Sequence, residues 1–231
     1  MTDRPDNSTQ AALDSGVHLS AGNPRPVLVI RRLDELLIAA EPERWAALGL
    51  AVGADGVAQV GTIRLRLGAP GEPGIAGWRV RGLADGDLDG LPTQGSAAPP
   101  RAPAPAADHP LGALAIDHVV VATPDLERTI AALERAGLEL RRVREAGPTA
   151  RQGFFVVGDA VLEVVGPNEP DGQGPASFWG LVLVVEDLDA AAERLGPLLG
   201  APRDAVQPGR RIATVRCEAG LGTAVALITP R

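Results

Sequence analysis

The strongest constraint on the fold is an internal repeat in the second half of the chain. A β-branched run at 115–122 leads into a helix-start signal around Asp125, after which apolar residues recur at helical spacing. The same order begins again at Phe178, and Asp187 stands 62 residues after Asp125. Repeats of this length are typical of supersecondary units that bury their apolar faces against each other. The repeat therefore predicts two similar units within 111–231.

Each unit has the pattern of one strand, one helix and further strands. We expect helices over 125–136 and 187–199, and later strands over 139–145, 153–157, 160–165, 211–216 and 223–228. The turn-forming pair Gly158-Asp159 separates two of these strands. The domain at 111–231 is thus predicted to be α+β, built from paired βαβββ units.

Proline and alanine dominate the segment in front of this domain. Residues 93–110 contain five prolines, which cannot donate to a strand ladder or continue a helix. We therefore predict an unstructured linker over 93–110. A polar tail over 1–25 is also expected to be unstructured, which leaves 26–92 as a short N-terminal part.

The N-terminal part contains a degenerate, truncated copy of the same unit. When the two are aligned, Glu35 falls opposite His118, and Arg66 falls opposite Glu163. The helix of this copy is short, one strand is missing, and around 85–89 the chain resembles the beginning of a further unit. A carboxylate and a guanidinium at these two positions favour an ion pair, so we predict that Glu35 and Arg66 lie within salt-bridge distance.

The composition narrows the partners and the location. A net charge of −7 argues against nucleic acid or an anionic membrane surface as a partner. No apolar run reaches the roughly 18 residues of a membrane span, and the N-terminal residues lack the apolar stretch of a secretory signal. The single cysteine, Cys217, cannot form an internal disulfide, and we assign it to strand packing. We therefore expect a cytoplasmic protein.

Three segments together resemble the vicinal-oxygen-chelate superfamily, which includes glyoxalases, bleomycin-resistance proteins and dioxygenases. They are 116–129 (IDHVVVATPDLERT), 160–167 (AVLEVVGP) and 179–191 (WGLVLVVEDLDAA). The resemblance implies that the paired βαβββ units form an open, curled mixed sheet. It also implies a small-molecule site and a divalent metal inside the curl.

In that family each unit supplies one metal ligand from its first strand and one from its last. By position these residues are His118 and Glu163 in the first unit, and Gly180 and Ala226 in the second. Glycine and alanine cannot ligate through a side chain, so a divalent metal would keep at most two of four ligands. Alternatively, His118 and Glu163 could act as a metal-free acid/base pair, or His118 could merely bond a backbone carbonyl.

Four further residues are candidates for lining the ligand site. They are Phe154, Phe178, Trp179 and Arg211, of which the arginine could hold a carboxylate or phosphate. The predicted function is binding of a small metabolite, with a lyase, isomerase or dioxygenase-like reaction at His118 and Glu163. The expected partners are this ligand and a second copy of the chain in a homodimer. Two alternatives remain, namely a non-catalytic binder of the drug-sequestering type and an interaction protein.

Overall fold

The C-terminal part of the chain forms an eight-stranded mixed sheet from two equivalent units. The computed structural model describes residues 31–231, so the predicted tail over 1–25 lies outside the described residues. The first unit consists of β7 (Ala113–Ala122), α2 (Leu126–Arg135), β8 (Leu140–Glu145), β9 (Ala150–Val157) and β10 (Ala160–Pro167). The second consists of β11 (Ser177–Val185), α3 (Leu188–Leu195), β12 (Arg203–Asp204), β13 (Arg211–Thr214) and β14 (Ala224–Ile228). The strand order β12-β13-β14-β11-β7-β10-β9-β8 joins the units along β7 and β11.

The two long helices begin at the repeated aspartates. The Asp125 carboxylate accepts a hydrogen bond from the backbone N–H of Arg128, and Asp187 caps α3 in the same way. The predicted helices are therefore present, but the second is shorter than expected. It ends at Leu195 and continues only as a 3-10 turn (Gly196–Leu198). Within residues 31–231 no helix has the length and apolar character needed to cross a bilayer.

The N-terminal part is a smaller version of the whole paired domain, with both halves truncated. Its first half is β1 (Arg32–Ala39), α1 (Pro42–Leu48), β2 (Val57–Val60) and β3 (Ile63–Leu67). Its second half has β4 (Gly74–Arg81), β5 (Gly86–Asp87) and β6 (Pro92–Ser96), without a helix in between. The sheet order β2-β3-β1-β4-β6-β5 repeats the arrangement of the larger sheet, with β1 and β4 at the centre.

Strand β6 corrects the predicted linker. The expectation that 93–110 lacks regular structure is wrong for its first residues, which pair with β4, and for a 3-10 turn at Ala106–Asp108. Thr93 is buried there, and its hydroxyl accepts a hydrogen bond from the Trp78 indole at 2.7 Å. His109 is also buried. Its Nδ1 accepts a hydrogen bond from the backbone N–H of Ala51, and its Nε2 bonds to the backbone oxygen of Gln59.

The predicted ion pair between Glu35 and Arg66 is confirmed. Arg66 Nε donates to Glu35 Oε1 at 2.8 Å, and Arg79 Nη1 donates to the same oxygen at 3.0 Å. Arg64 forms an ion pair with the second carboxylate oxygen. Glu35 is fully buried, so this carboxylate depends on its three guanidinium partners.

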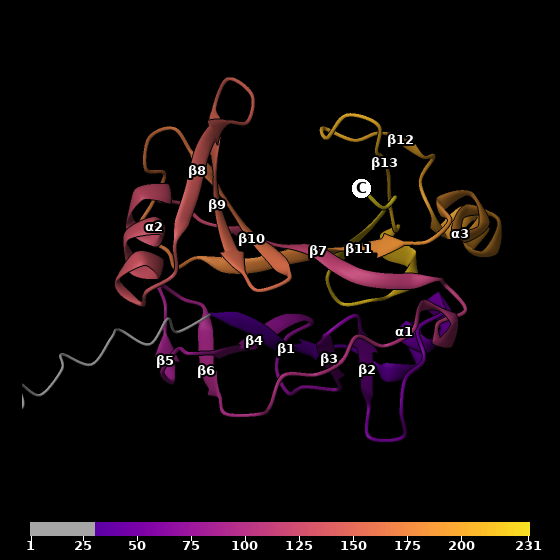
Figure 1. Ribbon diagram of the computed structural model, residues 1–231. Coiled ribbons are helices and arrows are strands. Elements are labelled where there is room, and N and C mark those ends of the chain that lie inside the picture. The colour runs from indigo at the N-terminus through magenta and orange to yellow at the C-terminus, as the bar shows by residue number, and fades with distance from the viewer. Residues whose placement is uncertain (1–30) are drawn as a thin grey trace, which may run out of the picture.

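The two sheets pack face to face around a shared core. Figure 1 shows the N-terminal sheet beneath β7 and β11, while β8–β9 and β12–β13 rise at the two ends of the larger sheet. Between the layers, the Trp78 and Phe178 rings meet edge to face with centroids 5.6 Å apart. The indole of Trp45 donates to the backbone of Leu221. Cys217 was expected in strand packing, but it is exposed in a 3-10 turn (Cys217–Ala219).

This packing predicts a stability difference between two tryptophans. Trp78→Ala removes a fully buried ring between the layers, and we expect it to lower the free energy of unfolding by roughly 3–5 kcal/mol. Trp179→Ala is the matched control because that side chain is 60% exposed, and its effect should stay within about 0.5 kcal/mol. Urea unfolding followed by circular dichroism measures both. Equal losses in the two variants would contradict a shared core between the sheets.

Candidate functional site

His118 and Glu163 face each other on the open side of the C-terminal sheet. β7 and β10 run parallel, with His118 paired to Val161 and Glu163 paired to Val120. Because alternate strand residues share a face, this register places both side chains on the same side of the sheet. His118 Nε2 lies 3.6 Å from Glu163 Oε2. That separation is too long for a hydrogen bond, so both atoms remain able to contact a third group between them.

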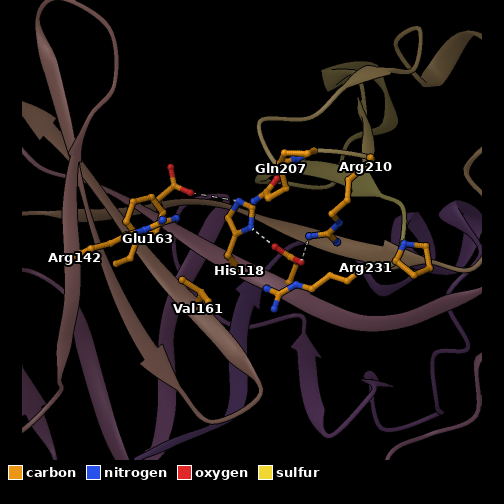
Figure 2. A pocket seen from close by; sticks show the side chains of 12 residues that line it. His118, Arg142, Val161, Glu163, Gln207, Arg210 and Arg231 are labelled. Atoms are coloured by element: carbon orange, nitrogen blue, oxygen red, sulfur yellow. Dashed lines mark hydrogen bonds and ion pairs between the residues drawn. The ribbon is translucent and has the colours of Figure 1, made fainter.

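Asp117 joins this pair through a bulge in β7. Opposite β11, His118 pairs with Val182 and Ile116 pairs with Leu183, so Asp117 is the extra residue of the strand. A bulge re-aims a side chain, and here Asp117 Oδ2 accepts a hydrogen bond from His118 Nδ1 at 2.8 Å. Figure 2 shows the resulting chain of contacts from Glu163 through His118 to Arg210.

Arg210 completes the support of the imidazole. Its Nη1 donates to Asp117 Oδ1 at 2.7 Å, and its Nε donates to the backbone oxygen of Thr229 at 2.8 Å. Burial alone would raise the pKa of the Asp117 carboxyl. The hydrogen bonds from His118 and Arg210, together with their charges, outweigh this effect and lower the pKa to about 2. Asp117 is therefore ionised at neutral pH, and its carboxylate holds the Nδ1–H of His118.

Glu163 is held from the opposite side. Gln152 Nε2 donates to Glu163 Oε1 at 2.5 Å, and Arg144 Nε donates to Gln152 Oε1 at 2.8 Å. The guanidinium groups of Arg142 and Arg144 lie over the Phe154 ring, 4.8 and 5.1 Å from its centroid. Both members of the His118–Glu163 pair thus have one side anchored and one atom free.

The pair stands between two cavities that share it. The first, which we call the arginine chamber, has a volume of about 540 Å³ and is lined by Asp117, Arg142, Phe154, Val161, Arg210 and Arg231, among others. The second, the aliphatic chamber, has a volume of about 440 Å³ and is lined by Val120, Val165, Trp179, Val182, Ile212 and Ala226, among others. His118 and Glu163 line both. A ligand next to the pair can therefore extend in two directions.

The structure brings together some of the predicted site residues and not others. Phe154 lines the arginine chamber and Trp179 lines the aliphatic chamber. Phe178 packs instead between the two sheets. Arg211 points to the surface, where it donates to Asp189 at 2.9 Å.

Sequence reasoning missed Asp117 and Gln152, and it chose Arg211 in place of Arg210. The sequence did place an arginine pair at 210–211, but it could not tell which member turns inward. Asp117 stands next to His118 in the sequence, and ordinary strand alternation assigns it to the other face. Only the bulge brings it to the site.

The residues present do not fit a divalent metal. The pairing registers make His118 equivalent to Gly180 and Glu163 equivalent to Ala226, as the sequence alignment expected. Within residues 31–231 no three His, Cys, Asp or Glu side chains are grouped to hold a metal ion. A Cβ on Gly180 would lie 2.4 Å from the backbone oxygen of Ala224, so this position has no room for a ligating side chain. His118 and Glu163 alone make a weak site.

The incomplete donor set predicts little bound metal. Elemental analysis of protein purified without added metal should find well under one equivalent of any divalent ion per chain. Addition of Zn²⁺, Mn²⁺ or Ni²⁺ should not raise the melting temperature, because two ligands supply little binding energy. One tightly held ion per chain, lost in His118→Ala, would contradict this prediction.

The buried Asp117–Arg210 pair predicts a change of stability with pH. The pKa of Asp117 is lowered from 3.8 to about 2, so its stabilising effect is present above pH 4 and is lost as the pH falls toward 2. Asp117→Asn should cost roughly 2 kcal/mol of unfolding free energy at pH 7, and this cost should shrink between pH 4 and pH 2. Asp189→Asn is the control, because solvent screens its exposed ion pair with Arg211. A cost of Asp117→Asn that stays constant with pH would disprove the assignment.

Comparisons with known proteins found a family model and solved structures that are similar to part of the chain. The model described as the Glyoxalase/Bleomycin resistance protein/Dioxygenase superfamily matches residues 115–198. Methylmalonyl-CoA epimerase from Mycobacterium tuberculosis is 21% identical, with a TM-score of 0.44 over 53% of this chain and 91% of that chain. A Streptomyces coelicolor methylmalonyl-CoA epimerase in complex with 2-nitronate-propionyl-CoA is 20% identical, with a TM-score of 0.42 over 51% and 94%. No curated protein matches the sequence.

The matched segment contains β7 with His118, β10 with Glu163, and the strand β11 that joins the two units. Residues 115–198, in the C-terminal part of the chain, are thus similar to the Glyoxalase/Bleomycin resistance protein/Dioxygenase superfamily.

Proposed function

We propose that the C-terminal domain binds a small carbonyl compound between the two chambers and that His118 and Glu163 transfer a proton on it. The observation that carries this proposal is the pair itself. His118 Nε2 and Glu163 Oε2 lie 3.6 Å apart at the junction of two cavities, and the other polar atoms of both groups are already bonded. Their free atoms are thus available to the same ligand atom.

Asp117 and Arg210 serve the reaction by positioning His118. The ionised Asp117 holds the Nδ1–H bond, so Nε2 of a neutral imidazole presents its lone pair toward the cavity. When Nε2 takes up a proton, the same carboxylate stabilises the imidazolium that forms. Arg210 in turn keeps Asp117 ionised.

The proposed step is proton abstraction from a carbon next to a carbonyl group. His118 Nε2 removes the proton, and the electron pair of the C–H bond moves to the carbonyl oxygen as an enolate. The imidazolium that forms then returns this proton to the product, directly or through the Glu163 carboxylate 3.6 Å away. Isomerisation and elimination both begin in this way, so the proposal covers the isomerase and lyase classes.

Non-catalytic binding is the second candidate function. Ala226 lines the aliphatic chamber at the position equivalent to Glu163, so the second unit supplies no equivalent carboxylate to a ligand there. The two candidates agree on where the ligand lies. They differ on whether the proton of the ligand exchanges.

Deuterium exchange separates the two functions. Short ketones and oxo acids are incubated with the protein in D₂O, and proton NMR follows loss of the C–H signal next to the carbonyl. We expect catalysed exchange for at least one compound, with a loss of at least about 100-fold in His118→Asn and in Glu163→Gln. The melting temperatures of both variants should stay close to that of the unmodified protein.

Two controls separate chemistry from folding. His109→Asn removes the buried histidine that bonds the backbone, so it should lower the melting temperature while the folded fraction keeps its exchange rate. Glu193→Gln alters an exposed residue of α3 and should change neither. Compounds that raise the melting temperature without any exchange would replace the catalytic proposal by non-catalytic binding. Full exchange in His118→Asn would overturn the assignment of the pair.

A further inference from the structure

The two chambers on either side of the His118–Glu163 pair differ in chemistry. The walls of the aliphatic chamber are mostly Val, Leu, Ile and Ala side chains, with Gln152, Arg203 and Thr214 among them, and the indole of Trp179 is exposed. The arginine chamber has guanidinium groups on two sides. Figure 2 shows Arg142 and Arg210 on opposite sides of His118, one from β8 and the other from the segment before β13.

The arginine chamber has guanidinium donors without a partner. Within residues 31–231 no carboxylate lies within ion-pair distance of Arg142, an exposed residue whose guanidinium lies over the face of Phe154. Arg210 is 4% exposed, and its Nη2 finds no hydrogen-bond partner in the described part of the chain. A buried N–H donor normally has an acceptor, so this atom indicates that an acceptor is supplied from outside the protein.

The carboxylates of the chamber do not supply it. Both oxygens of Asp117 are taken by His118 Nδ1 and Arg210 Nη1. Glu163 is held by Gln152 on one oxygen and faces His118 with the other. An anionic group on a ligand would therefore meet Arg142 and the free Nη2 of Arg210, and guanidinium N–H groups form charge-assisted hydrogen bonds with carboxylates and phosphates.

We infer that the ligand is an amphiphilic anion, with an aliphatic group in the aliphatic chamber and a carboxylate or phosphate in the arginine chamber. This inference rests on the proposed function for the position of the ligand and names its chemical class. The carbon that joins the two parts lies beside His118 Nε2 and Glu163 Oε2. Burial of the aliphatic group supplies affinity, and the anionic group sets the direction in which the ligand enters.

The test uses four ligands of six carbon atoms each that differ in the head group. Hexanoate, hexyl phosphate, hexanol and hexylammonium are titrated while the tryptophan fluorescence is recorded. The chain has no tyrosine, and Trp45 and Trp78 are fully buried, so a change of signal reports Trp179 beside the aliphatic chamber. Trp179→Phe should abolish the ligand-induced change of fluorescence. The rise in melting temperature gives a second readout of binding.

We expect at least one of the two anions to bind about tenfold or more tightly than hexanol, and hexylammonium to bind most weakly. The comparison of hexanoate with hexyl phosphate tells a carboxylate site from a phosphate site. Arg142→Gln should weaken binding of the preferred anion about fivefold or more and leave hexanol unchanged. Arg141→Gln is the matched control on the same strand, because Arg141 pairs with Glu139 and does not line the chamber.

Three results would overturn the inference. These are equal affinities for the anions and hexanol, an equal loss for all four probes in Arg142→Gln, or no binding of any probe. Failure of this inference is distinguishable from failure of the proposed function, because the binding of these four probes is measured without any reaction. Anion binding with no deuterium exchange would remove the proposed reaction and keep the ligand class. Deuterium exchange on neutral ketones, with no preference of the protein for anions, would keep the proposed reaction and remove the ligand class.

Discussion

The antiparallel pairing of β7 with β11 runs through the middle of the C-terminal sheet, and the rest of the molecule is arranged around it. It joins the two units, and its irregular register leaves Asp117 as an extra residue beside His118. Because β10 pairs with the other edge of β7, Glu163 reaches the same face two positions along. The opposite face of both strands is covered by the N-terminal sheet. One strand pairing thus sets both the site and the core.

Equivalent positions of the sheets carry different chemistry. His118 corresponds to Gly180 in the second unit and to Glu35 in the N-terminal copy, as the strand registers show. In the N-terminal copy, the buried carboxylate of Glu35 is neutralised by arginines. In the second unit, Gly180 has no side chain, and in the first unit, His118 faces a cavity. Only the first of these positions keeps a polar group next to open space. The fold therefore offers several equivalent places, and side-chain chemistry alone makes one of them a candidate site.

Much of the fold could be predicted because local sequence patterns determine its helices and long strands. Strand alternation and capping aspartates located the long strands and both helices of the C-terminal units, and alignment of the copies predicted the Glu35–Arg66 pair. The two-residue strand β12 and the strand β6 were missed, because β12 is too short to show a period and β6 is stabilised by Thr93 and Trp78 across the sheet. The bulge at Asp117 and the inward turn of Arg210 depend on partners far along the chain, which no local pattern reveals.

The covering of β7 and β11 by the N-terminal sheet has a consequence for how the domain behaves on dilution. A sheet face that a separate subunit covers becomes exposed when the subunits dissociate at low concentration. Here the covering layer belongs to the same chain, and the linker that ends in His109 holds it at a high effective concentration. Burial of that face is therefore a unimolecular property, so the floor beneath the His118–Glu163 pair is as well ordered in a very dilute sample as in a concentrated one.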